Sequence, residues 1–257
     1  MTGRARPTDT AAVRHTSIPA AFNGPRASAH GGYACATFAR TSGLRPPVAV
    51  TLIAPPPLET PIELVSQERR CSVYAHGELI ATVTAVSPSL GADIAGVDLA
   101  TAAAAARKFT DLGHPFPTCF VCGHQRTDGA GLALTPGPVP DRPDTVACPW
   151  TPRAASADGD GVPGEGIVPE ELIWSVLDCP GGWVRDPAVA PAVLTRMSTE
   201  ITGVVLAERP HVVVGTLLRA HGRSRTVATA LYTETMTLVA KATATWTELA
   251  IPPAAGD

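Results

Sequence analysis

The sequence contains one structural plan twice: a short helical segment followed by strands in which apolar and polar residues alternate. The first copy has a predicted helix at 30–40 and predicted strands at 47–53, 61–65 and 71–86. The second copy repeats this order with a helix at 170–178 and strands at 191–201, 211–220 and 229–246. Tyr74 corresponds to Tyr232 in this alignment, and Leu79-Ile80-Ala81 corresponds to Leu238-Val239-Ala240. A duplicated helix-and-sheet unit places a cleft between its copies, so we expect a ligand there.

The last predicted strand shows the alternation most clearly. Apolar residues at 238, 240, 242, 244 and 246 alternate with mostly polar residues at the odd positions. This pattern is typical of a sheet with one buried face and one solvent-exposed face. The stripe Leu172, Ile173, Val176 and Leu177 would cover the buried face, and Pro180-Gly181-Gly182 is expected to end that helix. The pattern predicts an α+β fold in which each unit is an antiparallel sheet wrapped around a central helix.

The repeat divides the chain into five parts. We expect a disordered arm at 1–12, a first unit at 13–97, a bridging helix and linker at 98–144, a second unit at 145–250 and a tail at 251–257. The first strand is expected near residues 13–21. An alanine-rich run after Asp98 is the bridging helix, and the Gly- and Asp-rich stretch at 157–166 is expected to be a flexible loop that could act as a lid.

Composition excludes several classes of function. The chain has 257 residues and a formal net charge of -3, without the basic excess that drives binding to nucleic acid. It has neither a signal-peptide core nor about 18 consecutive apolar residues, so we expect a cytoplasmic protein that does not bind membranes. The six cysteines are unevenly spaced and are expected to be reduced thiols.

Several motifs resemble those of the acyl-CoA thioesterase-like double hotdog proteins, the thioesterase II-like superfamily. They are Asn23-Gly24-Pro25, His30-Gly31-Gly32-Tyr33, Pro46-Pro47, Leu79-Ile80-Ala81 and the run from Trp174 to Trp183. The resemblance covers roughly residues 13–249. It implies a pseudo-dimer whose sheets join edge to edge, with an acyl-CoA or acyl-carrier thioester held between the two helices. It also leaves homo-oligomer formation open, because hotdog units commonly associate further.

Thioester hydrolysis requires a group that activates water and donors for the developing oxyanion. Asp178 lies within an apolar helical pattern and is our candidate general base; the alternative is a carboxylate that caps a helix or pairs with an arginine. Backbone amides at Gly31 and Gly32, beside Tyr33, lie at a predicted helix N-terminus and could bind the oxyanion. The alternative is that both glycines allow a helix to pack closely on the sheet.

The family resemblance implies a catalytic set of Asp, Thr and Gln. Asp178 and Thr195 fall at the first two positions, whereas the Gln position falls on Ala244, so Thr195 could equally be an ordinary sheet residue. His30 with Asp178 could instead form the acid–base pair of a 3-hydroxyacyl thioester dehydratase, unless His30 only contacts solvent at a helix start. A third alternative is an acyl-binding protein without catalysis, which the alanine at 244 favours.

Two further groups could bind a cofactor or a substrate. Arg223 and Arg225 flank a predicted turn and could contact the phosphates of CoA, unless they only belong to a solvated turn.

Cys119 and Cys122 have the spacing of a zinc-binding pair, which His114, His124, Cys148 or Cys179 would have to complete. Buried packing cysteines are the first interpretation of this pair, zinc the second and a redox disulfide the third, so we expect no cofactor.

Overall fold

A computed structural model describes residues 12–87, 93–153 and 166–250 of the chain. Most of the predicted N-terminal arm, all but one residue of the predicted loop at 157–166, and the predicted tail at 251–257 lie outside the described residues. None of the described helices is both long and apolar enough to cross a membrane.

The described residues form one large antiparallel sheet with three α-helices and one short 3-10 helix. The helices are η1 (Ala20–Phe22), α1 (Gly31–Ser42), α2 (Leu99–Ala106) and α3 (Glu170–Trp183). The strands before α2 are β1 (Ala12–Thr16), β2 (Val48–Leu52), β3 (Ile62–Ser66), β4 (Arg70–Ala75) and β5 (Glu78–Ala85). Those after it are β6 (Gly137–Pro138), β7 (Thr145–Trp150), β8 (Ala192–Ile201), β9 (His211–His221), β10 (Ser224–Thr233) and β11 (Leu238–Glu248).

The sheet runs in the order β1-β3-β4-β5-β2-β8-β11-β10-β9-β7-β6, so that β2 and β8 join its two halves. This junction is short: Ala49, Val50 and Thr51 pair with Ser198, Met197 and Arg196. Side chains reinforce it, because Ser198 Oγ donates to the Val48 carbonyl at 2.8 Å and Arg196 Nη1 donates to Thr51 Oγ1 at 2.7 Å. The two halves therefore form a continuous sheet.

The two halves share a strand order and one irregularity. Outward from the junction, the order is β2-β5-β4-β3-β1 on one side and β8-β11-β10-β9-β7 on the other. Tyr74 pairs with Leu79, and Tyr232 pairs with Leu238, in each case directly after a register shift. The carbonyls of Ile80 and Val239 each accept hydrogen bonds from two successive backbone amides of the strand end beside them. The matched tyrosines of the sequence thus occupy matched places in the sheet.

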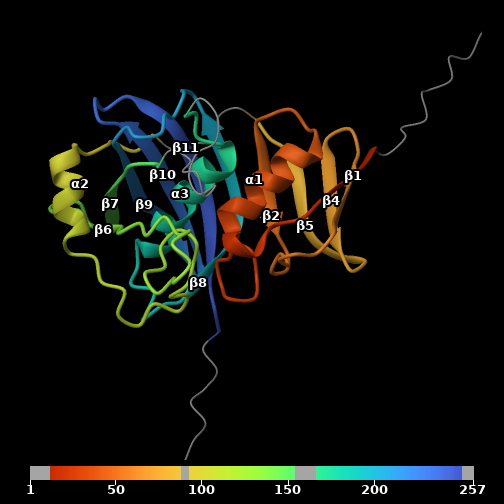
Figure 1. Cartoon of the computed structure of the whole chain (residues 1–257), viewed down its shortest axis with the longest axis horizontal. Coiled ribbons are helices and arrows are strands. Elements are labelled where there is room, and N and C mark those ends of the chain that lie inside the picture. The colour runs from red at the N-terminus through yellow and green to blue at the C-terminus, as the bar shows by residue number, and fades with distance from the viewer. Residues whose placement is uncertain (1–11, 88–92, 154–165, 251–257) are drawn as a thin grey trace, which may run out of the picture.

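Helices α1 and α3 lie side by side on one face of the sheet, whereas α2 lies at the far end of the second half (Figure 1). Alternate residues of β9 separate the two faces: Val213 belongs to the core beneath α3, and Val212 and Val214 belong to a second cluster that includes Ala102 and Ala105 of α2. The predicted bridging helix therefore covers the outer face of the second half.

Helix α3 does not end at Pro180, as the sequence suggested, but continues to Trp183. A proline inside a helix removes one backbone hydrogen bond, and here tertiary packing outweighs that cost. A Cβ atom on Gly182 would lie 2.8 Å from the Trp246 ring, and one on Gly215 would lie 3.0 Å from Pro180 Cβ. The proline and the glycines allow this turn of helix to lie directly on the sheet.

The first strand is also shorter than expected. It ends at Thr16, and the 3-10 helix η1 follows within the segment for which a single strand was predicted.

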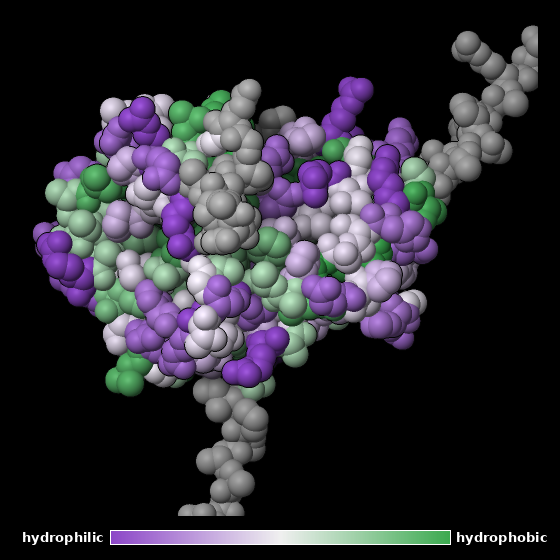
Figure 2. Space-filling model, viewed as in Figure 1, coloured by the Kyte–Doolittle hydropathy of each residue, from purple (hydrophilic) through white to green (hydrophobic). Residues whose placement is uncertain are grey.

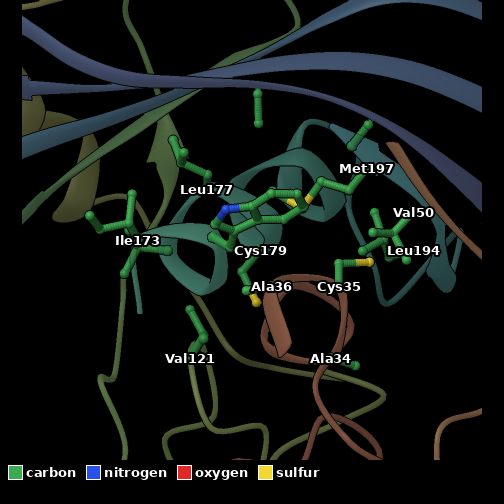
Figure 3. Packing of buried hydrophobic residues seen from close by; sticks show 14 of the residues in the cluster. Ala34, Cys35, Ala36, Val50, Val121, Ile173, Leu177, Cys179, Leu194 and Met197 are labelled. Carbon is green, nitrogen blue, oxygen red and sulfur yellow. The ribbon is translucent and has the colours of Figure 1, made fainter. Parts of the chain in front are cut away.

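The main core lies where the two halves meet. Figure 3 shows Cys35 and Ala36 of α1 next to Cys179 of α3, with Met197 of β8 on one side and Leu177 of α3 on the other. Each of these side chains is buried. Small residues on α1 allow the two helices to approach each other, so one hydrophobic core serves both halves.

The segment 107–136, between α2 and β6, has turns and bends but no helix or strand. Arg126 is its anchor: the side chain is only 7% exposed and donates to Asn23 Oδ1 at 2.6 Å, to the Thr118 carbonyl at 2.9 Å and to the Ala21 carbonyl at 3.0 Å. These bonds attach the segment to the loop before α1. The face of the molecule seen in Figure 2 mixes hydrophilic and hydrophobic residues.

Replacing Gly32 by alanine tests the closeness of the two helices. A Cβ atom there would lie 2.7 Å from both Asp178 Cβ and the Trp174 carbonyl oxygen, so we expect Gly32→Ala to lower the free energy of unfolding by about 1–3 kcal/mol, as overpacking does. Urea unfolding measures this. Helix propensity alone predicts the opposite sign, a gain of about 1 kcal/mol, so a stabilised variant would contradict the packing described. Gly77→Ala is the control, because nothing lies within 4 Å of its added Cβ and only the positive φ of 79° opposes it.

Candidate functional site

An apolar pocket opens between the two halves of the molecule. The first half contributes the end of β2 with the residues after it, and the N-terminus of α1; the second half contributes α3, β8 and Trp246 of β11. The segment 114–122 closes one side. Its apolar walls include Leu52, Pro56, Phe116, Trp183, Leu194 and Trp246. The pocket lies where the sequence predicted a cleft.

His30 and Asp178 lie at the polar part of this pocket, and both are only 2% exposed. His30 is the N-cap of α1, and its Nδ1 accepts a hydrogen bond from Tyr33 N–H at 3.3 Å. Asp178 lies on α3, with one carboxylate oxygen, Oδ2, 3.6 Å from His30 Nε2. The structure thus brings together two candidate residues that are 148 positions apart in the sequence, and places His30 away from solvent.

Asp178 bridges the two helices. Its Oδ2 accepts the backbone N–H of Gly32 at 2.7 Å, so a carboxylate from α3 satisfies an amide in the first turn of α1 and lies at the positive end of its dipole. The other oxygen, Oδ1, is buried and has no hydrogen-bond partner among the described residues. Burial raises the pKa of Asp178 to about 6, against the opposing effects of His30 and of the Gly32 hydrogen bond.

The two glycines serve packing as well as hydrogen bonding. A Cβ atom on Gly31 would lie 2.9 Å from the Leu194 side chain, and Gly32 is even more restricted. Because the Gly32 amide is already bonded to Asp178, it is not free to bind an oxyanion. The amide of Gly31 has no partner within the part of the chain that the structure describes, and Gly31 lines the pocket. Gly31 is therefore the available donor.

Thr195 lines the pocket, but its hydroxyl is engaged in the sheet. Thr195 Oγ1 donates to the Thr245 carbonyl at 3.1 Å and lies 3.1 Å from Thr247 Oγ1. Ala244, where the resemblance implies a glutamine, is buried in β11 opposite Met197 and Val227. The Thr195 hydroxyl thus has its partners on β11, and Ala244 has no polar side-chain group to offer Asp178.

Tyr33, Arg223 and Arg225 do not line this pocket. Tyr33 stacks on Phe22 with 3.9 Å between ring centroids. Arg225 is 2% exposed, donates to the Ala190 carbonyl at 3.1 Å and lies 3.6 Å from Glu248, whereas exposed Arg223 contacts the Glu248 carbonyl. The expected contact of Arg225 with CoA phosphates does not fit a guanidinium so deeply buried, and the two arginines instead hold the end of β11.

Two cysteines, Cys119 and Cys179, lie beside His30. Cys179 Sγ lies 3.2 Å from His30 Nε2 and 3.9 Å from Cys119 Sγ. Cys122, also buried, contacts His114 Nε2 through its sulfur at 3.2 Å. Contacts with Cys122 and Cys179, and the proximity of His30, lower the pKa of Cys119 well below its usual range. The spacing of Cys119 and Cys122 identified this pair, but no local signal placed His30 next to it.

The remaining candidates for completing a metal site lie elsewhere. Cys148 is buried in β7, and His124 Nε2 lies 3.2 Å from the Leu134 carbonyl oxygen. Of the residues that sequence reasoning considered, Cys179 is the one that shares a contact with Cys119.

Solved structures with the same fold include several thioesterases. The tesB protein of Mycobacterium avium subsp. paratuberculosis superposes with a TM-score of 0.57 at 15% identity, over 96% of this chain and 95% of that one. The acyl-CoA thioesterase II TesB2 of Mycobacterium marinum gives a TM-score of 0.53 at 12% identity, over 94% of both chains. A protein from Novosphingobium aromaticivorans gives a TM-score of 0.59 at 14% identity, over 95% and 98%.

The protein therefore has the hotdog fold, which it shares with these solved structures over nearly its whole length. At these identities the comparison establishes the fold and not the reaction. No protein-family profile matches the sequence, and no curated protein matches it either.

Substitution of Asp178 tests its role as a bridge between the helices. Asparagine keeps an oxygen that can accept the Gly32 amide and removes a buried charge, so we expect Asp178→Asn to change the free energy of unfolding by less than about 1 kcal/mol. Alanine leaves that amide without a partner, and we expect Asp178→Ala to cost about 1–3 kcal/mol. Thermal and urea unfolding of the two variants measure the difference. Equal stabilities would show that the hydrogen bond contributes nothing.

Proposed function

We propose that the chain is a fused double hotdog that hydrolyses acyl thioesters through Asp178. Its substrate would be an acyl-CoA or the acyl thioester of a carrier arm. The observation that carries the proposal is a buried carboxylate in an apolar pocket, with one oxygen held by the Gly32 amide and the other without a partner among the described residues.

The shared strand order supports the proposal of two fused units. Each half has its own helix, α1 or α3, and the same register shift beside Tyr74 and Tyr232. The proposed units keep the ranges expected from the sequence, 13–97 and 145–250, joined by 98–144. The pocket takes its walls from both units, which is what a site between fused copies requires.

The pocket suits an acyl thioester because its walls are mostly apolar and its polar groups lie together. An acyl chain can lie against Leu52 and Phe116, while the thioester carbonyl reaches the α1 N-terminus. There the Gly31 amide and the helix dipole favour the negative charge that develops on the carbonyl oxygen. Apolar walls also exclude water from the rest of the site, which strengthens these interactions.

The reaction proposed is direct attack by water. Asp178 Oδ1 accepts a proton from a water molecule, whose oxygen adds to the thioester carbonyl carbon while the Gly31 amide stabilises the resulting oxyanion. Collapse of the tetrahedral intermediate breaks the carbon–sulfur bond. The thiolate leaves with the proton that Asp178 had accepted, so the products are a carboxylic acid and a free thiol. Thr195 contributes through the sheet and the pocket wall, without contacting the reacting atoms.

One observation favours a second candidate reaction. His30 Nε2 lies 3.6 Å from Asp178 Oδ2, and the two residues come from opposite halves, as an acid–base pair for dehydration of a 3-hydroxyacyl thioester would require. Binding without turnover is the third candidate, and the alanine at 244 supports it.

The activity is tested with purified protein and a panel of acyl-CoAs of different chain length, by following free thiol release. We expect hydrolysis by the wild-type chain and a loss of about 100-fold or more in kcat/KM for Asp178→Asn, the range expected for a general base. Glu63→Gln, which neutralises an exposed carboxylate on β3, is the matched control and should retain full activity.

The alternatives give different results in the same assay. Conversion of a 3-hydroxyacyl-CoA to the enoyl thioester without thiol release would show that the enzyme catalyses dehydration and not hydrolysis. Binding of acyl-CoA by calorimetry without product would indicate an acyl-binding protein. Hydrolysis that is unchanged in Asp178→Asn would reject the proposed mechanism.

A further inference from the structure

Half of the cysteines in the chain meet at one place. Cys119 and Cys122 come from the irregular segment before β6, Cys179 comes from α3, and the three side chains are all buried. The other cysteines, Cys35, Cys71 and Cys148, lie singly in α1, β4 and β7. The gathering of three thiols therefore needs an explanation beyond the ordinary packing of buried cysteine.

An imidazole completes the cluster. The ligand atoms of His30, Cys119 and Cys179 all lie within 4.8 Å of one another. Cys122, three positions after Cys119, is near enough to both of these thiols to affect their pKa values, and its own sulfur lies 3.2 Å from His114 Nε2. The cluster thus offers three sulfurs and one ring nitrogen, drawn from three separate segments of the chain.

We infer that His30, Cys119, Cys122 and Cys179 bind one zinc ion in a tetrahedral Cys3His site. Three thiolates and one imidazole form one of the usual ligand sets of structural zinc. The two-residue spacing of Cys119 and Cys122 allows both to chelate the same ion.

Two distances between the ligand atoms can be compared with tetrahedral geometry. Zinc–sulfur bonds of about 2.3 Å and zinc–nitrogen bonds of about 2.0–2.1 Å place two sulfurs about 3.8 Å apart and a sulfur and a nitrogen about 3.6 Å apart. Cys119 Sγ and Cys179 Sγ are 3.9 Å apart, and His30 Nε2 is 3.2 Å from Cys179 Sγ. His30, Cys119 and Cys179 would have to draw together around a common centre, and Cys122 would have to leave His114 Nε2, 3.2 Å from its sulfur, and turn toward that centre as the fourth ligand.

Coordination by His30 has a local cost. A neutral imidazole that binds zinc through Nε2 carries its proton on Nδ1, which here accepts the Tyr33 amide at 3.3 Å. That long hydrogen bond must be given up. The free energy lost with this hydrogen bond is small compared with that gained from the metal–thiolate bonds. The Tyr33 amide also lies in the first turn of α1, where amides have no intrahelical partners.

A bound zinc ion would fix the pocket wall. The segment 107–136 has no helix or strand of its own, yet it closes one side of the pocket. Irregular segments of this length in compact domains need other anchors. Zinc would tie this segment to α3 and to the N-terminus of α1, in addition to the hydrogen bonds of Arg126.

The inference is independent of thioester hydrolysis but restricts its mechanism. With Nε2 bound to zinc, His30 could not exchange a proton with a substrate, so dehydration by His30 and Asp178 would be excluded. Asp178, which is not among the four ligands, would remain the acid–base group. The presence of metal is measured without substrate, so failure of either proposal leaves the other testable.

The first test is metal analysis of wild-type protein purified without chelators. We expect close to one zinc ion per chain. After removal of zinc with a mercurial and a chelator under reducing conditions, addition of Co²⁺ should give the sulfur-to-cobalt charge-transfer band and the strong visible bands of a tetrahedral thiolate site. This measurement uses the unaltered chain, so it does not depend on the folding of any variant.

The second test compares single substitutions. Cys119→Ser, Cys122→Ser and Cys179→Ser should each lose most of the bound zinc and weaken the charge-transfer band. Cys71→Ala and Cys148→Ala, which change buried cysteines outside the cluster, should retain one zinc per chain. Circular dichroism of all five variants shows which of them are folded.

Three outcomes would overturn the inference. Wild-type protein with less than about a tenth of an equivalent of metal and no cobalt band would exclude the site. A disulfide among Cys119, Cys122 and Cys179 in unreduced protein, found by mass spectrometry of peptides, would assign the cluster to redox chemistry. Equal zinc content in wild-type and folded Cys119→Ser protein would place the metal elsewhere.

Discussion

The close crossing of α1 and α3 is the constraint on which the rest of the structure depends. Gly31 and Gly32 allow the first turn of α1 to approach α3 so closely that a Cβ atom at position 32 would meet Asp178 and Trp174 at 2.7 Å. This approach lets a carboxylate from one half accept an amide from the other at 2.7 Å. The shared core, the pocket and the buried charge all follow from one contact between helices.

Much of this arrangement could be predicted from the sequence because it depends on local periodicity. Alternation in residues 238–246 and the stripe at Leu172, Ile173, Val176 and Leu177 identified strands and a helix that the structure contains. The predicted end of α3 was wrong because tertiary packing outweighed the local sequence signal. Pro180 normally ends a helix, but close packing against Gly215 and Trp246 holds the chain helical for another turn.

The site was predictable only in part, because local periodicity can single out a residue but not the residues that it meets in the fold. Asp178 stood out as an acid in an apolar pattern, and the structure buries it at the pocket. The meeting of His30 with Cys119 and Cys179 joins segments more than 50 residues apart, and no periodicity encodes such a contact. The burial of Arg225 was missed because a turn beside it suggested exposure, whereas its guanidinium lies under the end of β11.

The matching strand orders give each helix an N-terminus that faces the other helix, but the two ends differ in chemistry. At α1, the Gly32 amide donates to the carboxylate of Asp178; at α3, Glu171 forms an ion pair of 2.7 Å with Arg40, whose side chain is 67% exposed. The second location thus has an ion pair with an exposed arginine, whereas the first has a buried acid next to a buried histidine. The two halves thus match in strand order but not in the side chains at these helix ends, and the chemistry proposed for Asp178 would have no counterpart at the second location.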